Sequence, residues 1–263
     1  MEYETIRYET AGGIGRITFW RPEAMNAITP TLLNETRAAV LHAGNDEEAK
    51  ILVLTGEGKA FSAGVDLKWL KGRDFKGGKV GSALDDPARA LIESIRSVPK
   101  VVIALVKGFC LTGAVEIILA CDLVISAEDA RFGDTHAKWG LRPTWGMSAR
   151  LPHRVGFLKA KEVSFTADLI TAKEAERIGL INLAVPADQV ENTLQSLAAR
   201  IMSNSPQSIA AYKRLYNTIE DLTVEKGLET ERLASFDISD TAERLTPFLK
   251  EPGKPGIQPE DKK

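Results

Sequence analysis

The feature that most constrains the fold is an uninterrupted run of aliphatic and β-branched residues at positions 51–55. A run without polar alternation is typical of a strand that is covered on both faces of a sheet. Further strands are expected at residues 101–106, 123–126 and 180–185, and segments of helical character separate them. Because strands alternate with helices as far as Pro186, the sequence predicts an α/β core.

Turn and capping residues predict the elements around these strands. A turn at Gly12-Gly13 joins two strands near the N-terminus. Thr29 at an N-cap and Pro30 at the first helical position begin a helix that extends to about Ala43. Further helices are expected at residues 88–97, 114–120 and 173–178, and a mobile glycine-rich loop is expected at 72–87.

The pattern changes after Pro186. Residues 188–203 and 206–239 are almost wholly helical in character, with a break at Asn204-Ser205-Pro206. We therefore expect a core at residues 1–187 and a helical C-terminal region at 188–250. The prolines and charges of residues 251–263 predict a disordered tail.

Composition excludes several classes of protein. Lys and Arg total 34 and Asp and Glu total 36, so the net charge of −2 gives no strong field for nucleic acid or an anionic membrane. Two cysteines without a Cys-x-x-Cys spacing and only three histidines make a zinc site unexpected. The acidic N-terminus does not resemble a signal peptide, and no apolar run has the length of a membrane span. A cytoplasmic protein without a membrane partner is expected.

Two junctions, at residues 59–67 and 107–116, place small residues where the chain opens into a helix. The first N–H groups of a helix are unpaired and carry partial positive charge. Two such groups that converge on one point would bind an oxyanion. On spacing alone, however, tight packing is the more common reason for small residues at such turns.

Both junctions resemble signature blocks of the crotonase (enoyl-CoA hydratase/isomerase) superfamily. Other blocks resemble the family in the same order, and the resemblance extends over roughly residues 3–250. These further blocks are residues 21–28, 120–122, 130–133, 140–152, 169–175 and 179–181.

The resemblance implies a spiral of ββα units with a helical C-terminal trimerisation region, and hence a homotrimer or a dimer of trimers. It also implies an acyl-CoA substrate, in which coenzyme A is part of the substrate, and no bound metal or other cofactor. The thioester carbonyl would be held by the N–H groups of Val65 and Gly113. Residues expected to bind the substrate or its coenzyme A part are Ala63, Asp66, Leu67, Lys68, Lys59 and Arg21. For the three basic residues, Lys68, Lys59 and Arg21, an ordinary solvated surface charge is an equally good explanation of their presence.

The acid–base pair is the most informative part of the resemblance. Hydratases of this family use two glutamates, and Glu116 aligns with the first, three residues after Gly113 on the same helix face. Burial would raise its pKa, as a general base requires. His136 stands where the second glutamate would be, and an imidazole can also transfer a proton near pH 7. Alternatives are a structural Glu116 paired with a distant base and a His136 that only hydrogen-bonds, while Asp134 could orient His136 or point away.

Four further residues are candidates for the acyl pocket, namely Trp69, Trp139, Thr144 and Trp145, with core packing an equal alternative for the tryptophans. Some isomerases and dehalogenases of the family carry a catalytic Asp at about the position of Thr144. Because threonine is not a carboxylate nucleophile, this residue argues against an aspartyl-ester dehalogenase.

The leading hypothesis is hydration of a 2-enoyl-CoA to a 3-hydroxyacyl-CoA, or its reverse, in fatty acid metabolism. His136 in place of a glutamate keeps open another enolate reaction, such as isomerisation, decarboxylation or C–C cleavage. A non-catalytic binding module is a third hypothesis. The net charge of −2 counts against an RNA-binding version of that module.

Overall fold

The structure is a computed structural model that describes residues 2–250, so the tail expected at 251–263 lies outside the described residues. The chain divides after Ser203 into a larger N-terminal unit and a helical C-terminal unit. No helix among the described residues is long and apolar enough to cross a lipid bilayer.

The larger sheet of the first unit contains the long apolar runs. Its strands, in spatial order, are β1 (Ile6–Ala11), β2 (Ile14–Phe19), β3 (Ile51–Gly56), β5 (Val102–Val106), β7 (Leu123–Ala127) and β10 (Leu183–Val185). β1 and β2 form the expected antiparallel hairpin, and all the other pairs are parallel. β3 and β5 are buried along their whole length, which confirms the predicted α/β core.

A second, smaller sheet consists of very short strands. They are β4 (Ala60–Ser62), β6 (Phe109–Leu111), β8 (Arg131–Gly133) and β9 (Ile170–Thr171). β4, β6 and β8 pair in parallel, and β9 joins β8 in the antiparallel direction. Since β4 follows β3, β6 follows β5 and β8 follows β7, each turn of the chain adds one strand to each sheet. This repetition is the expected spiral of ββα units.

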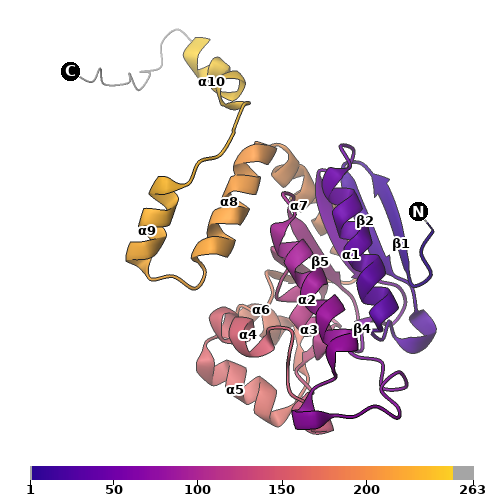
Figure 1. Ribbon diagram of the computed structural model, residues 1–263. Coiled ribbons are helices and arrows are strands. Elements are labelled where there is room, and N and C mark those ends of the chain that lie inside the picture. The colour runs from indigo at the N-terminus through magenta and orange to yellow at the C-terminus, as the bar shows by residue number, and fades with distance from the viewer. Residues whose placement is uncertain (1, 251–263) are drawn as a thin grey trace. The chain divides into compact units, whose positions relative to one another are not determined.

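Helices cover both faces of the larger sheet, as the opposite faces of β3 illustrate. On one face, Leu52 and Leu54 belong to the main core with residues of α1 and α2, and these two helices lie side by side (Figure 1). On the other face, Ile51 and Val53 pack in a second cluster with residues of α7. The helices of this unit are α1 (Pro30–Asn45), α2 (Ser82–Ser97), α3 (Gly113–Ile118), α4 (Met147–Val155), α5 (Phe157–Thr166), α6 (Ala172–Arg177) and α7 (Val190–Met202). Thr29 caps α1 through a 3.3 Å bond from Leu32 N, as predicted.

α2 begins earlier than expected. The sequence predicted a helix from Ala88, because Pro87 and several glycines precede it, but the helix starts at Ser82 and contains Pro87. Leu84 is buried in the main core, and the carboxylate of Asp85 accepts two side-chain hydrogen bonds. These tertiary contacts outweigh the one backbone hydrogen bond that the proline removes.

The C-terminal unit contains α8 (Pro206–Ile219), α9 (Val224–Leu233) and α10 (Thr241–Lys250). The predicted break is present, and Ser205 caps α8 by accepting a 3.2 Å bond from Ser208 N. The division after Ser203 falls one helix later than the boundary expected at 187. The reason is α7, whose residues Val190 and Leu194 are fully buried against the larger sheet.

Asn26 anchors the loop between β2 and α1. The side chain is fully buried, and its Nδ2 donates to Glu57 O at 2.9 Å and Ala60 O at 2.7 Å. Its Oδ1 accepts from Arg21 N at 2.9 Å. One amide therefore ties this loop to both ends of the β3–β4 turn.

We expect Asn26→Asp to lower the free energy of unfolding by about 2–5 kcal/mol, because a near-isosteric carboxylate cannot donate to the two carbonyls. Urea denaturation at pH 7 measures the loss. Asn45→Asp is the matched control, since the exposed Asn45 makes one bond of 3.1 Å to Leu41 O and should cost less than about 1 kcal/mol. Equal losses in the two variants would contradict the anchoring role.

Candidate active site

Three segments far apart in sequence meet at one edge of the smaller sheet. Parallel neighbouring strands end at the same edge, so the residues after β4, β6 and β8 are brought together there. Thr112 N donates to Gly133 O at 2.8 Å, and the hydroxyl oxygens of Thr112 and Thr135 lie 3.0 Å apart. A Cβ added to Gly64 would stand 2.8 Å from Leu111 O, so the first two segments are also in close contact.

The N–H groups of Val65 and Gly113 both lie in this region and are unpaired among residues 2–250. Val65 forms a parallel bridge with Ile28, in which Ile28 bonds to the residues on either side and leaves the N–H of Val65 unused. Gly113 is the first residue of α3, where an N–H has no acceptor within the helix.

Each of these two N–H groups follows a residue with positive φ. Gly64 has a φ of 85°, and Thr112 has a φ of 54°, which is uncommon for a β-branched residue. Such a conformation costs on the order of 1–3 kcal/mol and persists only where surrounding contacts fix it. The hydrogen bonds of Thr112 supply those contacts, so the chain direction at Gly113 is firmly set.

A cavity of about 370 Å³ opens beside these segments. Eight of the residues that the sequence singled out line it, namely Ala63, Val65, Leu67, Glu116, His136, Trp139, Thr144 and Trp145. Most of the other lining residues are apolar and were not predicted to line a pocket; they include Met25, Val80, Leu111, Leu141, Ala167 and Leu169. Gly113 lies directly behind the wall, since an added Cβ would stand 2.4 Å from the ring of Trp145.

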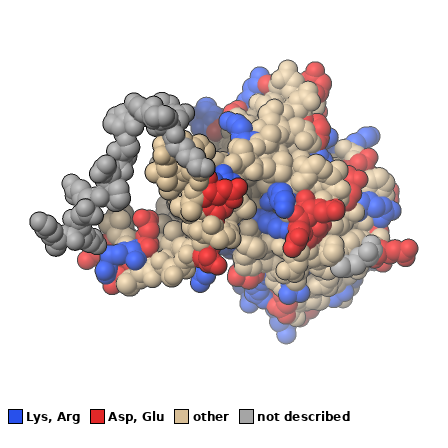
Figure 2. Space-filling model, turned by 90° about the horizontal axis from the view of Figure 1, so that it is seen from above, with Lys and Arg blue, Asp and Glu red and all other residues tan. Residues whose placement is uncertain are grey.

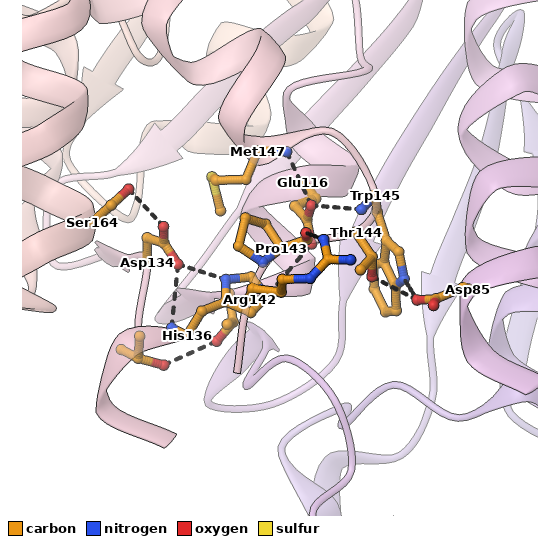
Figure 3. A network of polar contacts seen from close by, with 12 residues as sticks. Asp85, Glu116, Asp134, His136, Arg142, Pro143, Thr144, Trp145, Met147 and Ser164 are labelled. Atoms are coloured by element: carbon orange, nitrogen blue, oxygen red, sulfur yellow. Dashed lines mark hydrogen bonds and ion pairs between the residues drawn. The ribbon is translucent and has the colours of Figure 1, made fainter. Parts of the chain in front are cut away.

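Glu116 is the most deeply buried carboxylate of the site, with 1% of its surface exposed. Its Oε1 accepts from Trp145 N at 2.9 Å and Met147 N at 3.0 Å, and its Oε2 lies 3.7 Å from His136 Nε2 (Figure 3). Burial raises the pKa of Glu116, while the nearby imidazole and the two amides oppose this effect in part. Among residues 2–250, the polar contacts of the Glu116 carboxylate are thus with two backbone amides and the imidazole of His136.

His136 is held from its other side by Asp134. Nδ1 of His136 lies 2.6 Å from Asp134 Oδ1, and Asp134 Oδ2 accepts from Ser164 Oγ at 2.7 Å (Figure 3). Burial would raise the pKa of Asp134, but the hydrogen bonds from His136 and Ser164 outweigh it and hold that pKa below the ordinary 3.8. Ser164 was not predicted, because nothing in the local sequence links it to a residue 30 positions earlier.

Trp145 connects the cavity wall to α2. Its Nε1 donates to Asp85 Oδ1 at 2.9 Å, and Thr144 Oγ1 donates to the same oxygen at 2.6 Å. Asp85 thus fixes the segment whose backbone binds Glu116. The sequence did not identify Asp85, which lay in the segment expected to be a loop.

Besides Gly113, five candidate residues do not line the cavity, namely Arg21, Lys59, Asp66, Lys68 and Trp69. Arg21 forms a 3.0 Å ion pair with Asp66, whose other oxygen accepts from the backbone N–H groups of residues 68 and 69. Lys59 and Lys68 are exposed. The ring of Trp69 lies 3.4 Å below the guanidinium of Arg73.

His136 also borders a second cavity of about 370 Å³. Asp134 and Ser164 line this cavity as well, together with apolar residues of α4 and α5. Leu141 and Arg142 are the other residues common to the two cavities. His136 therefore forms part of the wall of both cavities.

Known proteins share this architecture. The solved structure of an enoyl-CoA hydratase from Bacillus anthracis aligns with a TM-score of 0.86 at 28% identity, over 94% of this chain and 96% of that one. The ββα spiral thus has the crotonase-type fold.

Sequence comparisons agree with the fold. The family described as enoyl-CoA hydratase/isomerase matches residues 9–249. A probable enoyl-CoA hydratase of Rhizobium meliloti is 35% identical over 252 residues, which is 95% of this chain and 96% of that protein. A short-chain-enoyl-CoA hydratase of Clostridium acetobutylicum is 33% identical over 254 residues, again 95% and 96% of the two chains. The chain belongs to the enoyl-CoA hydratase/isomerase family.

The raised pKa of Glu116 predicts a pH dependence of stability. Because the folded protein binds this proton more tightly than the unfolded chain, wild-type stability falls as the pH rises from the ordinary value of 4.5 through the folded pKa. In the Glu116→Gln variant the glutamine side chain does not titrate, so the variant lacks this loss of stability with rising pH. We therefore expect the variant to gain stability relative to wild type between pH 4.5 and pH 7.5, measured by urea denaturation.

Glu174→Gln is a control of opposite sign. Hydrogen bonds from Arg177 lower the pKa of Glu174, so its contribution is present above pH 4.5 and is lost as the pH falls through the folded pKa. Relative to wild type, this variant should lose stability as the pH rises through the folded pKa towards 4.5, and the difference should then stay nearly constant up to pH 7.5. A Glu116→Gln difference that is constant with pH, or that changes like the control, would contradict the assignment.

Proposed function

We propose that the protein adds water across the double bond of a 2-enoyl-CoA thioester to give a 3-hydroxyacyl-CoA, and also catalyses the reverse reaction. The observation that carries this proposal is the 3.7 Å separation of Glu116 Oε2 and His136 Nε2 in the wall of one cavity. Two proton-transfer groups at that separation can serve two adjacent carbons of one substrate. The names of the two similar proteins from Rhizobium meliloti and Clostridium acetobutylicum support the same reaction.

The thioester carbonyl would accept hydrogen bonds from the N–H groups of Val65 and Gly113. When a nucleophile adds to the β-carbon, negative charge moves to this oxygen and the thioester becomes an enolate. Two fixed donors would stabilise that charge more than they stabilise the neutral carbonyl, each by about 3 kcal/mol. Their unpaired state and the fixed conformation of Thr112 support this role.

Hydration needs two proton transfers, one from the attacking water and one to the α-carbon, and Glu116 and His136 would each carry out one of them. Because Oε1 of Glu116 is bound by two amides, Oε2 is the oxygen that takes a proton from water as its hydroxyl group joins the β-carbon. His136, protonated at Nε2, then donates that proton to the α-carbon. Transfer of the proton from Glu116 to His136 across the short gap restores both groups, so the sum is one water added.

The cavity supports an acyl-CoA substrate. Its walls are mainly apolar and suit a hydrocarbon chain next to the two proton-transfer groups. Addition of water to a conjugated thioester needs only proton transfer and charge stabilisation, without a metal ion or redox cofactor. Coenzyme A enters as part of the substrate.

One alternative within the family is hydrolytic cleavage of a C–C bond through the same enolate. The Asp134–His136 contact of 2.6 Å favours this candidate, because an imidazole held by a carboxylate can also activate water.

A nucleic-acid-binding module has less support. Lys and Arg are interspersed with Asp and Glu on the face of the molecule in Figure 2, without an extended basic surface.

Incubation with crotonyl-CoA tests the proposal. We expect loss of the enoyl thioester absorbance and a product that is one water heavier, carrying label from heavy-oxygen water. Isomerisation would leave the product unlabelled, and C–C hydrolysis, for which a 3-oxoacyl-CoA is the appropriate substrate, would give two fragments of which only the released carboxylic acid carries the label. Absence of turnover with enoyl-CoA substrates of every chain length would exclude hydration.

Glu116→Gln should lower kcat by about 10²–10⁴-fold, since glutamine cannot accept the proton from water. Binding of the 3-hydroxyacyl-CoA, measured by calorimetry, should persist because the two N–H donors are unchanged. Undiminished kcat in this variant would exclude Glu116 as the general base.

We also propose that the chain forms a trimer or a dimer of trimers. Large apolar side chains are exposed on α8 and α9, among them Tyr212, Tyr216, Val224, Leu228 and Leu233. Surfaces of this kind are commonly covered by a partner. Light scattering should give three or six times the chain mass of 28.7 kDa, and a monomer at micromolar concentration would contradict the proposal.

A further inference from the structure

Behind His136 lies a chain of hydrogen bonds, buried at Asp134 and His136 and partly buried at Ser164, that the proposed reaction does not itself require. It runs from Ser164 Oγ to the carboxylate of Asp134 and from there to His136 Nδ1 (Figure 3). Asp134 and His136 expose only 3% and 7% of their surfaces. We infer that Asp134 and Ser164 are positioning residues that fix the tautomer and orientation of His136, an inference that rests on the proposed role of His136 in proton transfer.

Asp134 is held from two independent elements. Its Oδ1 faces His136, accepting from the backbone N at 3.3 Å and lying 2.6 Å from the ring Nδ1. Its Oδ2 accepts the 2.7 Å bond from Ser164, which belongs to α5. With both oxygens engaged, the carboxylate cannot rotate without breaking a bond, and the ring of His136 is held with it.

The charge of Asp134 decides which ring nitrogen carries a proton. The hydrogen bonds described above hold the pKa of Asp134 below its ordinary range, so the carboxylate is ionised at neutral pH and can only accept hydrogen bonds. Nδ1 of His136 must then be the donor. Nε2, the nitrogen that faces Glu116, is thereby the one left to gain and lose a proton.

A purely local role is the competing explanation for Asp134. Its bond to the backbone N of His136, two residues later, is an Asx turn that any acceptor side chain could make. Asp134→Asn separates the two explanations. Asparagine keeps an acceptor oxygen for this turn and an amide that can bond to Ser164, but it removes the negative charge beside the ring.

Nitrogen NMR of histidine-labelled protein tests the tautomer without reference to activity. The chain has three histidines, and His136→Gln identifies the signals of the one in the site. We expect the ring of wild-type His136 to carry a proton on Nδ1 whether or not Nε2 is also protonated, with a strongly downfield Nδ1–H signal, and expect this signal to move upfield or vanish in Asp134→Asn. A proton on Nε2 alone in wild type, or an unchanged signal in the variant, would overturn the inference whether or not the protein is a hydratase.

Kinetics test the consequence for turnover. Asp134→Asn should lower kcat by about 10²-fold while KM stays unchanged, because proton transfer is impaired and binding is not. Ser164→Ala should lower kcat by about 10-fold, the effect of one lost hydrogen bond to a charged group. Ser164→Thr restores the hydroxyl and should recover most of the loss.

Ser94→Ala is the matched control, since Ser94 is a buried helical serine that bonds to Ala90 O at 2.8 Å away from the site. It should leave kcat unchanged. A change in KM alone, or equal losses in the Ser94 and Ser164 variants, would show a structural role only and would overturn the inference. Wild-type inactivity on enoyl-CoA would instead count against the proposed function and would leave the NMR result valid.

Discussion

Parallel pairing among three very short strands is the constraint on which the rest of the site depends. β4, β6 and β8 have only three residues each, yet their pairing brings together segments that are about fifty and twenty residues apart in the chain. The register sets Leu111 opposite Gly133, so the next residues of both strands enter the site together. Since side chains alternate along a strand, a slip of one residue would turn the following segments away from the cavity.

A buried carboxylate imposes the second constraint. Glu116 can remain inside the protein because two backbone amides and an imidazole surround it, and the amides belong to a segment that Asp85 holds from α2. The early start of α2 is therefore part of the site. Without the turns before Pro87, there would be no residue on this helix to hold the ring of Trp145.

The sequence predicted those parts of the molecule whose signals are local. Long apolar runs identified the strands of the larger sheet, and the Thr29-Pro30 cap identified α1. Three-residue strands contain too few positions for a periodic pattern, so the smaller sheet could be inferred only from the resemblance to a family. The start of α2 was misplaced because proline and glycine count against a helix locally, whereas burial of Leu84 is a tertiary effect.

The site was predictable to a similar extent. Glu116 and His136 were identified by their positions within ordered blocks, and both line the cavity. Asp85 and Ser164 hold the site from elements that approach it only in the folded chain, so no spacing in the sequence could identify them. Lys59 and Lys68 lie in a matching block but outside the cavity wall, because a block fixes the course of the backbone and leaves the direction of a long exposed side chain open.

The short distance between Glu116 and His136 also bears on stereochemistry. An enoyl thioester is planar, and two groups only 3.7 Å apart can both lie on one side of that plane. A hydroxyl group and a hydrogen delivered from these positions would reach the two carbons from the same face. Syn addition, and with it a single relative configuration at substituted carbons, would then follow from the placement of two side chains rather than from any property of the substrate.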